Sequence, residues 1–201
     1  MLRRAAAALF GLVLLTVTAN AAGLTGMGAN IHGSFFHFPP ANLDKHMVHK
    51  ISVGKTRVTL SETRLVELRK VFGGTIKSGG GATWLCYVTD DATTWFISNA
   101  LGGQEFVMMV AVQNATGSVP SDCEAAGTKF STPVFDVPSL GATTADLKSH
   151  FGIAPGSGGK ITYRADEPGG YSDIAQYLGY VIKGGKVVGV GMGETSVVTQ
   201  H

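Results

Sequence analysis

The chain has 201 residues, with 16 Lys or Arg, 14 Asp or Glu, and a hydrophobic share of 44%. Two of the basic residues, Arg3 and Arg4, belong to the N-terminal segment, so the rest of the chain carries 14 of each sign. Nucleic-acid binding needs a clustered basic surface, whereas the basic residues here are scattered singly, which excludes that class of partner. The 28 glycines lie between apolar runs, a pattern typical of a folded, turn-rich β protein rather than a disordered one.

Residues 1–21 predict a secretory signal peptide. Arg3 and Arg4 precede the apolar run Ala5 to Val17, and the small residues Ala19 and Ala21 follow where a signal peptidase needs them. The run is too short for a permanent membrane helix, and no later stretch approaches the roughly 20 apolar residues of a span. No cysteine stands at the cleavage site to accept a lipid. We therefore expect cleavage near Ala21 and a periplasmic or extracellular protein without a membrane anchor.

Residues 22–56 contain Gly, Pro and His without a sustained period, and predict an irregular N-terminal arm. Four histidines fall within eighteen residues of one another, a residue type that binds zinc and copper. Only Asp44 lies nearby to complete a ligand set, so we expect no metal and no cofactor. The alternative function is a periplasmic metal- or small-ligand-binding protein that uses these four residues: His32, His37, His46 and His49.

An internal repeat organises the remaining chain. Residues 67–73 read Glu-Leu-Arg-Lys-Val-Phe-Gly and residues 146–152 read Asp-Leu-Lys-Ser-His-Phe-Gly, a spacing of 79 at which Thr83-Trp84 also matches Thr162-Tyr163. The predicted fold class is α+β, with two tandem repeats that each pack a short helix on a three- to four-stranded antiparallel meander. Module 1 spans residues 57–115, a linker spans 116–138, and module 2 spans 139–201.

Each predicted helix has start and stop signals. In module 2, Thr143 is the expected N-cap with Asp146 three residues on, and Gly152 is the stop. In module 1, Ser61 or Thr63 is the expected N-cap. The buried stripes are Leu65, Leu68 and Phe72 in module 1 and Leu147 and Phe151 in module 2. The predicted strands are 83–88, 94–99 and 106–113, then 160–165, 176–182 and 186–192, with glycine-pair hairpins before the last strand of each module.

Period-two alternation assigns the faces of the module 1 sheet. Trp84, Cys86 and Val88 should lie under the helix, on one face with Phe106, Met108 and Val110. The opposite face is too apolar for open solvent, so module 2, the arm or a partner must cover it. Because contiguous apolar patches with an aromatic residue are typical binding surfaces, we predict partner binding there, through Leu85, Tyr87, Val107 and Met109.

The only cysteines are Cys86 and Cys123, and a pair in an exported chain predicts a disulfide. The alternative is two unpaired thiols or a reactive one, but no His, Lys or Cys-x-x-Cys motif stands beside either to lower a thiol pKa. The disulfide would attach the linker to module 1.

Motifs for catalysis are absent from the sequence, so we expect no enzyme. The run Gly158-Gly159-Lys160-Ile161 lacks the Ser or Thr of a phosphate-binding loop. The acid pairs Asp90-Asp91 and Asp166-Glu167 stand where strands must end, which favours turns over catalytic carboxylates. No Gly-x-Ser-x-Gly elbow occurs.

The tandem pattern resembles the β-lactamase inhibitor protein family and the related SmpA/BamE-type envelope modules. The resemblance covers residues 51 to 195 but is carried by few positions: Gly141, Thr143, Leu147, Phe151, Gly152 and Tyr163, with Leu68, Phe72, Gly73 and Trp84 in the first copy. It implies a protein that grips another protein with its sheet surface, as an inhibitor, an immunity protein or an envelope-assembly factor. The chain departs from the inhibitor pattern in having one cysteine pair, and from the envelope modules in lacking a lipidation cysteine.

Overall fold

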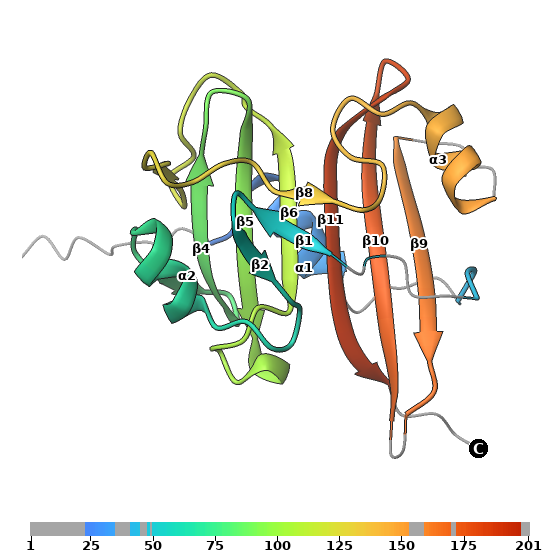
Figure 1. Cartoon of the computed structure of the whole chain (residues 1–201), viewed down its shortest axis with the longest axis horizontal. Coiled ribbons are helices and arrows are strands. Elements are labelled where there is room, and N and C mark those ends of the chain that lie inside the picture. The colour runs from blue at the N-terminus through green and yellow to red at the C-terminus, as the bar shows by residue number, and fades with distance from the viewer. Residues whose placement is uncertain are drawn as a thin grey trace, which may run out of the picture.

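The computed structural model describes residues 23–34, 41–44, 48, 50–152, 159–169 and 172–197. The fold is α+β, as predicted, with an eight-stranded sheet, a three-stranded sheet and three α-helices among these residues (Figure 1). The predicted signal peptide lies outside the described residues. No helix in the described part of the chain combines the length and apolar character needed to cross a membrane.

The helices are α1 (Gly26–Ser34), α2 (Leu65–Phe72) and α3 (Thr144–Phe151), with a 3-10 turn η1 (Ala100–Gly102). The small sheet has the order β2-β1-β8 and the large sheet β3-β4-β5-β6-β11-β10-β9, with β7 paired to β4. The strand bounds are β1 Ile51–Val53, β2 Thr56–Val58, β3 Lys77–Gly79, β4 Ala82–Val88, β5 Ala92–Asn99, β6 Met109–Asn114, β7 Glu124–Ala125, β8 Val134–Phe135, β9 Lys160–Glu167, β10 Asp173–Lys183 and β11 Lys186–Val197.

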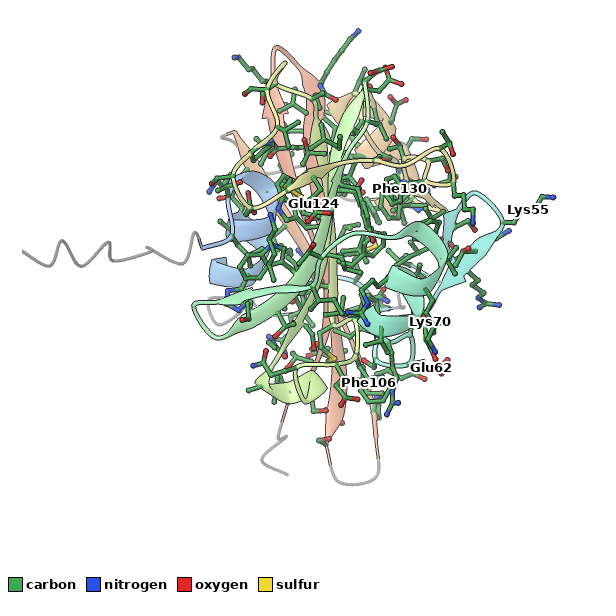
Figure 2. The ribbon with its side chains drawn as sticks, turned by 90° about the vertical axis from the view of Figure 1, so that its left-hand side faces the viewer. Lys55, Glu62, Lys70, Phe106, Glu124 and Phe130 are labelled. Carbon is green, nitrogen blue, oxygen red and sulfur yellow. A yellow bond between two sulfur atoms is a disulfide. The ribbon has the colours of Figure 1, made fainter. Side chains whose placement is uncertain are left out.

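The large sheet divides the molecule into two sides. In Figure 1, α2, α3 and the small sheet lie in front of it and α1 lies behind it. Figure 2 views the sheet nearly edge-on and shows α1 on one side, with α2 and the β1–β2 hairpin, tipped by Lys55, on the other. We call these two sides the α1 face and the α2–α3 face.

In each half of the large sheet a short helix precedes antiparallel strands, four after α2 (β3 to β6) and three after α3 (β9 to β11), and β6 pairs with β11 to join the halves. Arg64, before α2, bridges Phe106 in the segment that leads into β6, and Thr143, before α3, bridges Lys186 at the start of β11. The capping pair Thr143 and Asp146 is confirmed, with the Asp146 N–H donating to Thr143 Oγ1 at 3.2 Å. The first cap was predicted wrongly, because α2 begins after Arg64, whose N–H donates to Glu67 Oε2 at 3.1 Å.

The arm is not irregular throughout, because residues 22–56 contain α1, β1 and the start of β2. Residues 42 and 43 also close the outer edge of β9: both backbone N–H groups donate to the Arg164 carbonyl, at 2.9 and 3.0 Å. The Gln176 amide holds Val48 by accepting from its N–H at 2.8 Å and donating to its carbonyl at 3.0 Å. These partners lie over 100 residues away, so local sequence does not reveal them.

The faces of the module 1 sheet are the reverse of those predicted. The strand residues packed with Leu65, Leu68 and Phe72 of α2 are Leu85, Tyr87 and Phe96, while Trp84, Cys86 and Trp95 form a second cluster with Met27 and Ile31 of α1. Alternation along β4 was right, but alternation cannot say which face a helix covers. It also fails at Met108 and Met109, which both belong to the second cluster because β6 begins only at Met109.

Candidate binding site on the α1 face

Helix α1 is attached to the α1 face by two distant side chains, Asp122 of the linker and Gln113 of β6. Asp122 is fully buried, and its carboxylate accepts hydrogen bonds from the Thr25 N–H at 3.0 Å, the Thr25 hydroxyl at 2.6 Å and the Trp95 indole at 2.9 Å. Gln113 Oε1 accepts from the Met27 N–H at 2.8 Å. Both acceptors satisfy backbone donors that every helix leaves unpaired at its N-terminus, and the Asp122 charge is favourable there. These bonds fix where α1 begins.

Glycines let α1 approach the sheet closely. A Cβ on Gly28 would lie 2.8 Å from the Trp95 ring, and a Cβ on Gly191 would lie 3.0 Å from Cβ of Ile31. The Gly28 distance is shorter than real Cβ contacts, and the Gly191 distance is tight enough that Ile31 would have to move, so both positions favour glycine. The absence of side chains at Gly28 and Gly191 therefore sets the distance between the helix and the sheet, and α1 lies in a shallow trough on the sheet.

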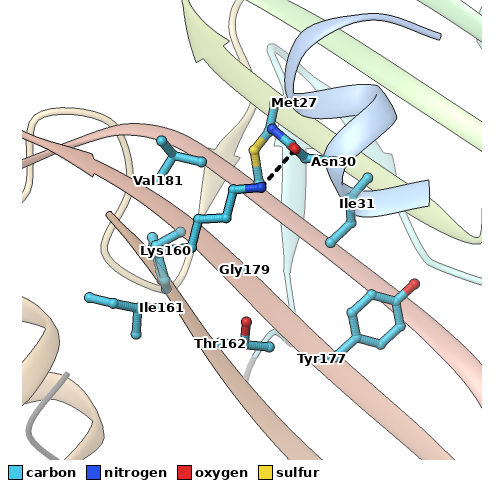
Figure 3. A pocket seen from close by; sticks show the side chains of 10 residues that line it. Met27, Asn30, Ile31, Lys160, Ile161, Thr162, Tyr177, Gly179 and Val181 are labelled. Carbon is cyan, nitrogen blue, oxygen red and sulfur yellow. Dashed lines mark hydrogen bonds between the residues drawn. The ribbon is translucent and has the colours of Figure 1, made fainter. Parts of the chain in front are cut away.

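A cavity of about 60 Å³ remains beside α1, between its second turn and strands β9 and β10 (Figure 3). Its apolar lining comes from α1 and from aliphatic and tyrosine residues of the sheet. Because Gly179 offers no side chain at the bottom, the space stays unfilled. The lining residues are Met27, Asn30, Ile31, Lys160, Ile161, Thr162, Tyr177, Gly179, Tyr180 and Val181.

The rim of the cavity on β9 is polar. Lys160 Nζ donates to Asn30 Oδ1 at 3.1 Å and so bridges the strand to α1 (Figure 3). Thr162, Arg164 and Asp166 continue the row, since alternate residues of a strand share a face. Arg164 and Asp166 are held together by two bonds of 2.7 and 2.9 Å. The lining contains one cation and no carboxylate among the described residues.

The predicted disulfide between Cys86 and Cys123 is confirmed. It fixes the 115–123 segment against β4 on the α1 face, where the Trp84 indole donates to the Asp122 carbonyl at 3.1 Å. The two sulfurs and the Asp122 carboxylate form the one cluster of potential metal ligands in the described part of the chain. Because the sulfurs are bonded to each other, the cluster positions α1 and does not offer a metal site.

The predicted partner-binding residues do not form a surface. Leu85 and Tyr87 are 1% and 2% exposed, and Val107 and Met109 are fully buried. The first three lie in the core under α2, where the Tyr87 hydroxyl donates to the Gly73 carbonyl at 2.8 Å and its ring stacks on Phe130 at 4.5 Å. Met109 lies on the opposite face, with the α1 cluster. The prediction of an exposed binding site at these four positions is therefore wrong, because all four side chains belong to the core.

Of the four arm histidines, the structure describes His32 alone. It lies in the second turn of α1, partly buried, and burial lowers its pKa from the ordinary value of 6.5. His37, His46 and His49 lie outside the described residues. The structure thus brings no two of the predicted metal ligands together in its described part.

Sequence reasoning missed the residues that build the α1 face. Asp122 and Gln113 look like ordinary linker and strand-end polar residues, because their partners Thr25 and Met27 are about 90 residues away. A signal existed in the glycines at 189, 191 and 193, whose spacing of two leaves one face of a strand bare. Such a stripe indicates that something packs closely on it.

Comparison with protein-family models, with curated proteins and with solved structures gave no match.

Proposed function

We propose that this chain is an exported, non-catalytic module that binds another protein on the α1 face of its large sheet. The observation that carries the proposal is the cavity beside α1, an apolar hollow of about 60 Å³ with a polar rim. Interfaces derive most of their affinity from one or two anchor side chains that fill such pockets, with polar groups around them. The α1 face already holds one helix, and packing of a helix against an apolar surface is a common mode of peptide recognition.

The α2–α3 face supports this assignment, because the protein's own helices and small sheet already cover it and leave its strands without an open surface. The α2–α3 face is covered by α2, α3 and the small sheet, which share one apolar cluster with the large sheet. The resemblance to sheet-gripping inhibitor and envelope modules implies binding through a sheet surface. On this chain the strand surface beside α1 on β9 and β10 is where such contact is possible, through Lys160, Thr162, Gly179 and Val181.

The chemistry of the cavity favours binding over catalysis. Its ten lining residues include hydroxyls and one amine but no imidazole, thiol or carboxylate. A hydroxyl nucleophile or a proton-transfer step normally needs one of those groups within hydrogen-bond reach. The disulfide between Cys86 and Cys123 fits an oxidising compartment and so supports export.

The two halves of the chain are, in this proposal, divergent copies of one module. Ser61 and Gly141 precede equivalent helices, and both have left-handed backbone with φ of 63° and 82°. Ser61 donates its N–H to the carbonyl of Val107, two residues before β6, and Gly141 donates its N–H to the carbonyl of Val187 in β11. Glycine is the residue expected there, so Ser61 is a departure in the first copy.

Site-specific photocrosslinking tests the proposal. A benzoylphenylalanine at position 162 reports on the rim of the cavity, and the same residue at exposed position 148 on α3 reports on the other face. In the exported fraction of the producing cell we expect one adduct of defined mass from position 162. An excess of untagged wild-type chain should remove it.

The partner identified from that adduct is then purified and its affinity is measured. Gly179→Leu should weaken binding at least tenfold, because the new side chain enters the cavity, while the melting temperature stays within a few degrees. A Cβ at this position would have no neighbour closer than 3.8 Å, which is an ordinary van der Waals distance. Adducts from both positions alike, or none from position 162, would contradict the assignment of this face.

A further inference from the structure

We infer that the cavity binds a carboxylate carried on a compact apolar group, as presented by the C-terminal residue of a partner that ends in Val, Leu or Ile. The inference rests on the proposed function, because it names the part of the partner that enters the α1 face. It is argued from the size of the cavity, the placement of its donors and the charge at its rim.

The size of the cavity limits the ligand. A cavity needs about 10–15 Å³ of such volume to hold one water molecule. The volume of about 60 Å³ therefore suits a group of about four to six heavy atoms. An aliphatic side chain of three or four carbons meets that limit, and an indole or a long acyl chain exceeds it. The contacts available to it are Met27 and Ile31 of α1, with Val181 and the bare backbone of Gly179 below (Figure 3).

Hydrogen-bond donors gather at one end of this apolar space. Lys160 and Thr162 stand on the same face of β9, and Asn30 faces them from α1. Since Asn30 Oδ1 accepts from Lys160, the Asn30 amide nitrogen is the part of that side chain left to donate to a ligand. An ammonium, an amide N–H and a hydroxyl beside an apolar hollow match a carboxylate whose carbon chain points inward.

The charge at the rim has one sign. Lys160 has a neutral hydrogen-bond partner, and no carboxylate lies within 4 Å of its ammonium among the residues described. The nearest acid on its row, Asp166, is engaged by Arg164. An incoming carboxylate would therefore gain a charge-assisted hydrogen bond without first displacing an acid of the protein. Capture of a terminal carboxylate is an established mode of peptide recognition.

The test uses the full exported chain and four defined probes. Two are pentapeptides, Gly-Ser-Gly-Ser-Leu with a free C-terminus and the same peptide with a C-terminal amide, and two are small molecules, isovalerate and isovaleramide. Affinities come from calorimetry, and amide NMR shifts at Ile31, Gly179 and Thr162 locate the site. The variants are Lys160→Met, which keeps the stem and removes the charge, and the matched exposed control Lys186→Met.

We expect the free-acid peptide to bind at the cavity and the amidated peptide to bind at least tenfold more weakly. Lys160→Met should weaken the acid at least tenfold and leave the amide unchanged, and Lys186→Met should change neither. Equal binding of acid and amide would overturn the carboxylate assignment, and so would an unchanged affinity in Lys160→Met.

The remaining outcomes separate this inference from the proposed function. If isovalerate binds and the free-acid peptide does not, the C-terminal assignment is overturned and the cavity is a small-molecule site. No binding of any probe would overturn the inference, whereas a crosslinked partner insensitive to Lys160→Met would leave protein binding intact. Acid-peptide binding without any crosslinked partner would instead count against the proposed function alone.

Discussion

The two faces of the large sheet are closed by different means. On the α2–α3 face, two amphipathic helices and a small sheet bury one continuous apolar cluster that includes Leu68, Tyr87 and Tyr180. On the α1 face, one short helix with glycines at 26, 28 and 33 covers part of the sheet. It is attached by the buried carboxylate of Asp122 and by close backbone approach at Gly191. The α2–α3 face is stabilised by burial of large apolar side chains. The α1 face is held by a few hydrogen bonds and by glycines that allow close approach, and a cavity remains there.

This difference has a physical consequence for stability. Burial of large side chains stabilises in proportion to the apolar area removed from water, and the α2–α3 face holds most of that area. A nine-residue helix with three glycines is too short and too unfavourable to form alone, so α1 depends on its contacts with the sheet. We therefore expect the α1 face to open before the rest of the protein unfolds.

The largest effect is expected on the packed face, from Tyr87→Ala. The change removes a ring in contact with Phe72, Phe96 and Phe130 and leaves the Gly73 carbonyl without its donor. The free energy of unfolding should fall by about 4 kcal/mol in denaturant melts. The exposed α2 residue Val71 is the control, since Val71→Ala should stay within about 0.5 kcal/mol. A nearly silent Tyr87→Ala would mean that this ring does not belong to the core.

A smaller loss is expected on the α1 face from Asp122→Ala, about 3 kcal/mol, because the Trp95 indole and the Thr25 N–H lose their acceptor. Amide hydrogen exchange should show loss of protection throughout α1 and little change in β9 and β10. Asp91→Ala at an exposed turn serves as the control. Uniform loss of protection over the whole sheet would contradict a separately opening α1.

Two glycine changes in one helix should have opposite signs. Gly28→Ala places a Cβ 2.8 Å from the Trp95 ring and should cost about 1–2 kcal/mol, because displacement of the helix outweighs its gain in helix propensity. Gly33→Ala meets no atom within 4 Å and should stabilise by up to about 1 kcal/mol. Thermal melts of the two variants decide the matter. Equal effects would show that the trough does not set the position of α1.

The smallest effect concerns pH and also separates the faces. Burial lowers the His32 pKa below 6.5, so the unfolded chain binds the proton more readily, and stability is full above pH 6.5 and falls as the pH drops below it. On α3, hydrogen bonds from the Thr143 backbone and then its hydroxyl lower the Asp146 pKa below 3.8, so its stabilisation is full above pH 3.8 and is lost below it.

Between pH 7 and pH 5, hydrogen exchange corrected for intrinsic rates should therefore accelerate in α1 and not in α3. His32→Gln should abolish that acceleration. Acceleration of α3 over the same range would show that a group other than His32 titrates with folding.

Much of the architecture could be predicted because it depends on neighbours in sequence. The Thr143–Asp146 capping pair, the Leu65, Leu68 and Phe72 stripe, and the β10–β11 hairpin around Gly184 and Gly185 all follow from contacts within a few residues. The tight hairpin predicted at Gly102-Gly103 was wrong, because the 3-10 turn η1 and residues 103–108 separate β5 from β6. The disulfide followed from composition, since two cysteines allow one intramolecular pair. Helix periodicity and strand alternation depend on residues a few positions apart, so a short stretch of sequence is enough to predict them.

The candidate site was decided by tertiary structure alone. Alternation separated Tyr87 from Trp84 but could not say which of them would meet α2, because either face of a strand can be buried. Helix α1 has glycines that disfavour it and first-turn acceptors about 90 residues away, so no local pattern predicts it. The cavity exists because Gly179 on β10 and Lys160 on β9 come to lie beside Asn30 of α1. Contacts between such distant segments depend on how the whole chain closes, which short-range propensities do not encode.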